Sequence, residues 1–220
     1  MLTKERVFEI MGNYYGNEFY RHAIRLNSTE HDLYLITEFL NKVNDLGYSF
    51  SGAHKLVITE DIRFVPIILN YYKKFNGQNF RSALLLSIRF RSYSRYIPQL
   101  LSIYEHTTLR QDKIDVSQCL LLMRCKEYIP QYLKIVNQPE YDSPDDLMMN
   151  LLCKLRVKEA IPRLLELLKN DPRWTWTFLW GAPFFREPSL IPYIEPFINS
   201  EDGEYRTMAR KAIEKLNKYL

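Results

Sequence analysis

The chain has 220 residues, of which 46% are hydrophobic and 25% are charged, and its formal net charge is +4 at pH 7. These fractions argue against an intrinsically disordered protein, and the length suits one sizeable core or one short solenoid. No stretch approaches about 18 consecutive apolar residues, and the first residues lack the basic and apolar pattern of a signal peptide. We therefore expect a single cytoplasmic domain over residues 1–220 that does not engage a membrane.

Residues 1–60 carry helical patterns without a clear repeat. Thr29 and Asp32 have the spacing of a capping box ahead of apolar residues at 33, 36, 40 and 43, which predicts a helix that ends near Asp45 and Gly47. We interpret residues 31–60 as a diverged repeat and the residues before them as an N-terminal cap. Terminal units of repeat proteins must cover an apolar face that would otherwise be exposed.

From residue 61 onward one dipeptide recurs. Ile precedes proline at residues 98, 130, 162 and 192, and Val precedes Pro66, so the prolines are separated by 32, 32, 32 and 30 residues. Proline is tolerated in the first turn of a helix, where backbone N–H groups have no intrahelical acceptor. Apolar residues follow at helical spacing, as at 161, 164, 165 and 168. Each marker therefore predicts the start of the first helix of a repeat.

A second helix is expected in each repeat. Ser143 and Asp171, each followed by proline, and Asp115, three residues before Gln118, have patterns typical of helix N-termini. Apolar runs at 120–123, 147–155 and 208–216 follow in the positions of second helices. We expect four apolar side chains to be buried between neighbouring helices: Leu121, Leu152, Ile161 and Leu165.

The segment 158–172, KEAIPRLLELLKNDP, resembles a HEAT-like repeat of the short kind, about 30 residues long, that also occurs in phycobilisome lyase-related proteins. The resemblance covers residues 61–220 as five repeats. It implies an all-α fold, namely a right-handed α-solenoid of about five to six helical hairpins that binds other macromolecules, and it supplies no catalytic residue. The chain departs from the family pattern at Arg124 and Arg156, where glycine is usual, and at Gly181 and Pro183 in the fourth second helix.

The positive charge is concentrated in the first two repeats. Residues 61–126 contain 11 Lys and Arg against 4 Asp and Glu, a net charge of +7. The densest part is a connection three residues longer than its equivalents, and it contains arginines interleaved with aromatic residues: Arg89, Arg91, Tyr93, Arg95 and Tyr96. An inserted loop of this kind is suited to phosphates, stacked bases or an acidic partner.

A structural explanation competes with recognition for some of these arginines. Arg89, Arg124, Arg156 and Arg186 recur near the ends of second helices, where cations interact favourably with the last carbonyls and the helix dipole. Arg91 and Arg95 lie outside that ladder. We expect them to be the recognition residues of the loop if it has any.

All three tryptophans, Trp174, Trp176 and Trp180, lie in the fourth second helix. Trp176 and Trp180 are four residues apart and would share one helix face, while Trp174 would point elsewhere. The three rings either fill the space between two repeats or form an aromatic binding surface.

No catalytic or metal-binding pattern is visible. The three cysteines lie in apolar runs, the four histidines are scattered singly, and nucleotide-binding, serine-hydrolase and zinc-protease motifs are missing. We therefore expect no metal and no cofactor, and we favour a protein-binding adaptor, regulator or neutralising partner over an enzyme. The alternative is a nucleic-acid-binding solenoid or a divergent HEAT-like DNA glycosylase, which the chain resembles in general character only.

Overall fold

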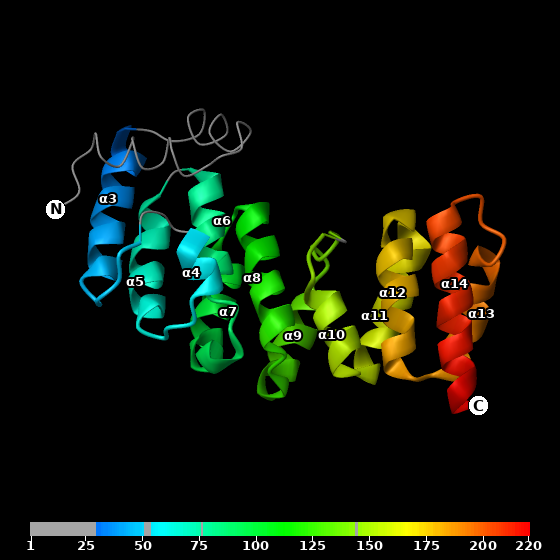
Figure 1. The fold of residues 1–220 in the computed structure, drawn as a ribbon. Coiled ribbons are helices and arrows are strands. Elements are labelled where there is room, and N and C mark those ends of the chain that lie inside the picture. Colours follow the sequence, from blue (N-terminus) through cyan, green and yellow to red (C-terminus); the bar gives the residue numbers. More distant parts are fainter. Residues whose placement is uncertain (1–29, 51–53, 76, 144) are drawn as a thin grey trace. The chain divides into compact units, whose positions relative to one another are not determined.

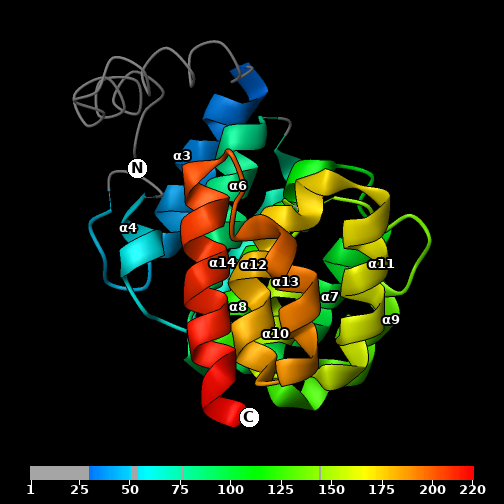
Figure 2. The same ribbon diagram turned by 90° about the vertical axis from the view of Figure 1, so that its right-hand side faces the viewer.

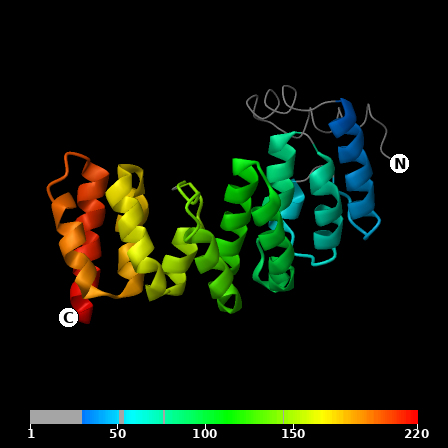
Figure 3. The same ribbon diagram turned by 180° about the vertical axis from the view of Figure 1, so that it is seen from behind.

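A computed structural model describes residues 30–50, 54–75, 77–143 and 145–220. The expected N-terminal cap falls on residues 1–29, outside the described part. Across the described residues the chain is helical and has no β-strand, as Figure 1 shows and Figure 3 confirms from behind. The prediction of an all-α fold is therefore confirmed. No helix in this part of the chain is both long enough and apolar enough to cross a membrane.

The chain divides into two compact units, Met1–Met123 and Arg124–Leu220, which we describe separately. In the first unit α3 packs against α5, α4 against α6, and α8 against both α6 and α7. The predicted helix near residue 33 is α3, and its apolar face is buried at Ile36, Leu40 and Val43. Its helices are α3 (Glu30–Asn44), α4 (His54–Ile58), α5 (Phe64–Tyr71), α6 (Gln78–Leu86), α7 (Ile97–His106) and α8 (Arg110–Met123).

The second unit consists of three helix pairs. In each pair the two helices contact one another, and the second helices also contact in series, α10 with α12 and α12 with α14 (Figure 2). Its helices are α9 (Ile129–Val136), α10 (Met148–Leu155), α11 (Ile161–Asn170), α12 (Thr175–Phe185), α13 (Ile191–Ile194) and α14 (Gly203–Leu216).

The proline markers do open helices. Pro98, Pro130, Pro162 and Pro192 each occupy one of the first two positions of a helix, in α7, α9, α11 and α13. Pro66 is the third residue of α5. The prediction is confirmed for a physical reason, because these positions have no intrahelical acceptor for the N–H that proline lacks.

Of the predicted helix N-termini, one is confirmed as a capping residue and one is wrong. Asp171 accepts a hydrogen bond from the Arg173 N–H at 2.9 Å, as a capping residue should. Asp115 is wrong as a cap, because α8 begins five residues earlier and buries this carboxylate. At the start of α10 it is Asp146 whose Oδ1 accepts from the Met148 N–H at 3.0 Å.

Arg124, Arg156 and Arg186 adopt the left-handed backbone conformation, with φ of 53°, 63° and 59°. Each directly follows a second helix. At Arg156 the backbone closes the end of α10, since the Arg156 N–H donates to Cys153 O at 2.9 Å and the Val157 N–H to Leu152 O at 3.0 Å. Glycine is the usual residue at such a helix end because it has no Cβ to clash. The three arginines therefore share a backbone role, and Arg89 lies outside this set.

The predicted core is partly wrong. Leu152 is fully buried, but Leu121, Ile161 and Leu165 are only partly buried. In α11 the buried residues are Leu164 and Leu167. An amphipathic stripe has two rows of apolar side chains, and here only one of them faces fully inward, so the prediction chose the wrong row.

Candidate macromolecule-binding surfaces

The arginine-rich connection in the first unit is a regular element and not an irregular loop. Residues Arg91–Tyr96 form a 3₁₀ helix, whereas the equivalent turns Lys126–Tyr128, Lys158–Ala160 and Pro188–Leu190 have three residues each. The insertion therefore lengthens a turn that three other repeats have in a shorter form. Arg91 and Arg95 are exposed, while Arg89 and Tyr96 are half-buried.

Tyr93 is wrong as a partner-binding residue. Its side chain is 1% exposed, and its ring packs edge-on against Phe90 with centroids 5.3 Å apart. Burial raises the pKa of Tyr93 to about 12. A 3₁₀ helix places every third residue on one side, so Tyr93 anchors the segment while Arg91 and Arg95 point outward.

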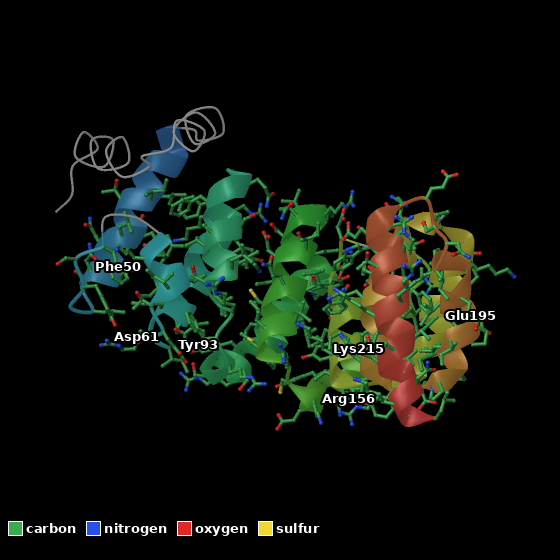
Figure 4. All side chains as sticks on the ribbon, turned by 45° about the vertical axis from the view of Figure 1, so that its right-hand side comes forward. Phe50, Asp61, Tyr93, Arg156, Glu195 and Lys215 are labelled. Atoms are coloured by element: carbon green, nitrogen blue, oxygen red, sulfur yellow. The ribbon has the colours of Figure 1, made fainter. Side chains whose placement is uncertain are left out.

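Carboxylates border this segment. Ser92 donates its hydroxyl to Glu60, and Asp61 accepts from Arg63 and, at 2.8 Å, from the Tyr48 hydroxyl. Figure 4 shows Asp61 and Tyr93 on the same part of the first unit. The Arg63 guanidinium holds the pKa of Asp61 down at about 2, so this carboxylate is charged at neutral pH. The surface around the two exposed arginines therefore carries charges of both signs.

Arg95 is itself partly engaged. Its guanidinium lies 5.0 Å from the centroid of the Tyr96 ring, and its Nη2 donates to the Tyr96 hydroxyl at 3.1 Å. This contact holds the arginine and the ring together at the surface. The pair could stack on a base or on an acidic side chain of a partner.

Trp174 is also wrong as a binding residue. It is fully buried and packs against Tyr141 with ring centroids 5.7 Å apart. It lies in the 3₁₀ turn Pro172–Trp174 ahead of α12, and not in the helix itself. The turn directs its ring into the core of the second unit, in agreement with the prediction that it points away from the other two tryptophans.

Trp176, Trp180 and Phe184 form a continuous row along α12, which we call the aromatic stripe. The rings of Trp176 and Trp180 are stacked at 14°, with centroids 5.9 Å apart, and Phe184 lies 4.9 Å from Trp180. Trp176 is 39% exposed and Trp180 is half-buried. The spacing of four residues did predict that the two tryptophans share a face, but not that this face reaches the surface.

The neighbouring second helices supply one charge beside each tryptophan of the stripe. From α14, the Glu204 carboxylate accepts a hydrogen bond from Trp176 Nε1 at 3.0 Å. From α10, Lys154 Nζ lies 5.2 Å from the centroid of the Trp180 ring. Burial, with a smaller contribution from Arg124, lowers the pKa of Lys154. Among the described residues neither Lys154 nor Arg124 has a carboxylate partner.

A buried polar cluster between α6 and α8 was not predicted from the sequence. Asp112 is fully buried and pairs with Arg81, and it also accepts from Gln78 at 3.3 Å and from the Thr107 hydroxyl at 3.1 Å. One turn further along α8, Asp115 is 2% exposed and accepts from Gln111 at 2.9 Å. Their spacing of three residues on a helix with weak apolar periodicity was the available signal.

Burial raises the pKa of Asp115, against hydrogen bonds from Ser82 and Gln111 that lower it. The hydrogen-bond donors to Asp115 lie on α6 and α8, so the cluster holds these two second helices together.

Cys119 and Cys153 are free thiols, and their burial raises the pKa of both. Within the described ranges, no three His, Cys, Asp or Glu side chains come together as a metal site would require.

Comparison of the chain with protein-family models, with curated proteins and with solved structures finds no match.

Proposed function

We propose that this chain is a right-handed HEAT-like α-solenoid that binds another protein through the aromatic stripe of α12. The repeat supports this proposal: helices begin at the proline markers, and the second helices contact in series within each unit. Stacked second helices form a continuous surface in proteins of this kind.

The observation that carries the proposal is the stacked pair Trp176 and Trp180 at the surface of the second unit. Tryptophan contributes more contact energy than most residues at protein interfaces, and it is enriched at their centres. Other aromatic side chains of this repeat, such as Trp174 and Phe178, are buried in the core. A stripe that reaches the surface at Trp176 beside such a core is suited to an apolar partner surface.

The charges beside the stripe favour a protein partner. Glu204 and Lys154 flank it with opposite signs, and a mixed polar rim around an aromatic centre is typical of protein interfaces. Nucleic acid is the second candidate, favoured by exposed Arg91 and Arg95 in the segment with a net charge of +7. Glu60 and Asp61 weaken that case, because they lie next to those arginines.

Affinity capture tests the proposal. The full chain is immobilised, and proteins are captured from a nuclease-treated lysate with wild type, Trp176→Ala, Tyr193→Ala and the double variant Arg91→Ala with Arg95→Ala. Tyr193 on α13 is 50% exposed and serves as the matched aromatic control. We expect loss of the captured protein with Trp176→Ala alone. Loss only with the arginine variant would move the site to the first unit, and capture that occurs only when nuclease is omitted would assign the binding to nucleic acid.

A further inference from the structure

We infer that the partner presents an acidic segment, with carboxylates beside Trp180 of the aromatic stripe, where Lys154 lies. This inference rests on the proposed function and names the chemistry of its partner. It follows from the charges along the stripe, which differ from one end to the other.

The end of the stripe near Trp176 is acidic. Glu204 bonds Trp176, and Asp202 caps α14 by accepting from the Glu204 N–H at 2.8 Å and from the Tyr205 N–H at 3.3 Å. These carboxylates therefore have donors of their own, one from a side chain and two from the helix backbone. This end of the surface needs no further cation.

The other end carries several cations. Among the described residues neither Lys154 nor Arg156 pairs with a carboxylate, whereas Glu214 further along α14 pairs with Lys218. Lys154 lies over Trp180, and Arg156 follows at the end of α10, exposed. Lys211 and Lys215 follow Glu204 on α14 by seven and eleven residues, so they lie on its helix face. Figure 4 shows Arg156 and Lys215 toward the end of this unit at which α14 terminates.

The electrostatics of Lys154 point the same way. Its ammonium group is partly desolvated and repelled by Arg124, and both effects lower its pKa. A docked carboxylate would relieve that repulsion, and the partial burial would strengthen the ion pair relative to one in water. The Trp180 ring beside it offers contact to the apolar stem of a Glu or to a neighbouring apolar side chain.

A nucleic-acid strand fits this pattern less well. Its backbone carries a negative charge at every nucleotide, so a strand stacked along Trp176 and Trp180 would bring phosphates close to Glu204. A peptide can place carboxylates at one end only. The charge distribution therefore favours an acidic peptide segment.

Selection from a random peptide library displayed on phage tests the inference with the full chain as bait. We expect enriched peptides that combine Asp or Glu with apolar residues, and weaker binding of those peptides to Lys154→Glu by about tenfold or more. Lys169→Glu, an exposed charge reversal on α11, is the matched control and should bind normally. An oligo(dT) titration runs in parallel.

The outcomes separate the two proposals. Enriched peptides that require Trp176 but are basic or neutral would overturn the acidic partner and leave the stripe as a binding surface. Peptides that bind Trp176→Ala as well as wild type, or no enrichment at all, would overturn both. Oligo(dT) binding that Lys154→Glu abolishes while the peptides show no such loss would replace the acidic peptide by nucleic acid.

Discussion

Gly181 of α12 lies directly against Cys153 of α10, because a Cβ at position 181 would stand 2.6 Å from Cys153 Sγ and 3.2 Å from its Cβ. Both residues are buried. A glycine inside a helix normally lowers stability by about 1 kcal/mol relative to alanine. Here it allows the two helices to approach, which explains the departure from the repeat pattern at this position.

Gly181→Ala should therefore lower the free energy of unfolding by about 1–3 kcal/mol, despite the better helix propensity of alanine. The measurement is urea unfolding of wild type, Gly181→Ala, Cys153→Ala and the double variant. We expect the loss from Gly181→Ala to shrink in the Cys153→Ala background, since the sulfur is then gone. Equal losses in both backgrounds would place the clash elsewhere.

Arg156→Gly should be more stable than Arg156→Ala by about 0.5–1 kcal/mol. Both changes remove the guanidinium, but only glycine, which has no Cβ, adopts a φ of 63° without a steric clash. Lys169, an exposed residue inside α11, is the control, and there alanine should exceed glycine. The same order at both positions, measured by denaturant unfolding, would contradict the backbone role.

Leu164→Ala should lower the free energy of unfolding by about 2–5 kcal/mol, and Leu165→Ala by clearly less. Leu164 is 1% exposed and Leu165 is only partly buried. The sequence analysis predicted that Leu165 is buried, whereas the structure buries Leu164 more fully. A larger loss at Leu165 would mean that the other row of α11 faces the core.

The sequence predicted the elements that depend on local chemistry. Ile161 and Pro162 locate the start of α11 because proline is compatible with the first turn of a helix. Asp171 caps the turn Pro172–Trp174 by accepting from the Arg173 N–H, a residue only two positions away in the sequence. Which row of an amphipathic helix is fully buried depends on the neighbouring helix, so Leu164 and Leu165 could not be ranked.

The candidate sites divide in the same way. The spacing of Trp176 and Trp180 was sufficient to place them on one face, but their exposure depends on how α10, α12 and α14 pack. Tyr93 was misassigned because an Arg and Tyr run has no apolar periodicity to show which ring turns inward. The Asp112 cluster needs two helices to exist, and Asp112 alone resembles an ordinary helix residue.

Asp115→Asn should stabilise the protein at pH 7, whereas Asp112→Asn should destabilise it by about 1–3 kcal/mol. Asn keeps the acceptor for Gln111 at position 115, but at position 112 it removes the charge that pairs with Arg81. Thermal unfolding of both variants beside wild type measures the difference. Destabilisation by both changes would show that the Asp115 charge is compensated.

The pH dependence of the Asp115 effect has a defined sign. Burial raises the pKa of Asp115 in the folded state above its ordinary value of 3.8, so the folded state binds this proton more tightly than the unfolded state. The wild type therefore loses stability from this group as pH rises from below 3.8 through the raised pKa, and the loss persists above it. The advantage of Asp115→Asn should grow over that interval and then stay constant. An advantage that instead shrinks as pH rises would mean that the pKa is lowered.

Arg91→Ala with Arg95→Ala should change the free energy of unfolding by less than about 0.5 kcal/mol, because both side chains are exposed and lie outside the left-handed helix ends. Tyr93→Ala in the same 3₁₀ helix should lower the free energy of unfolding by about 3–5 kcal/mol, because the Tyr93 ring is buried against Phe90.

Binding of single-stranded DNA to the arginine variant at two salt concentrations supplies the functional measurement. If the aromatic stripe is the main site, the arginine variant binds the captured protein as wild type does. A steep salt dependence that the arginine variant abolishes would instead assign Arg91 and Arg95 to phosphate contacts, and the first unit would then bind nucleic acid.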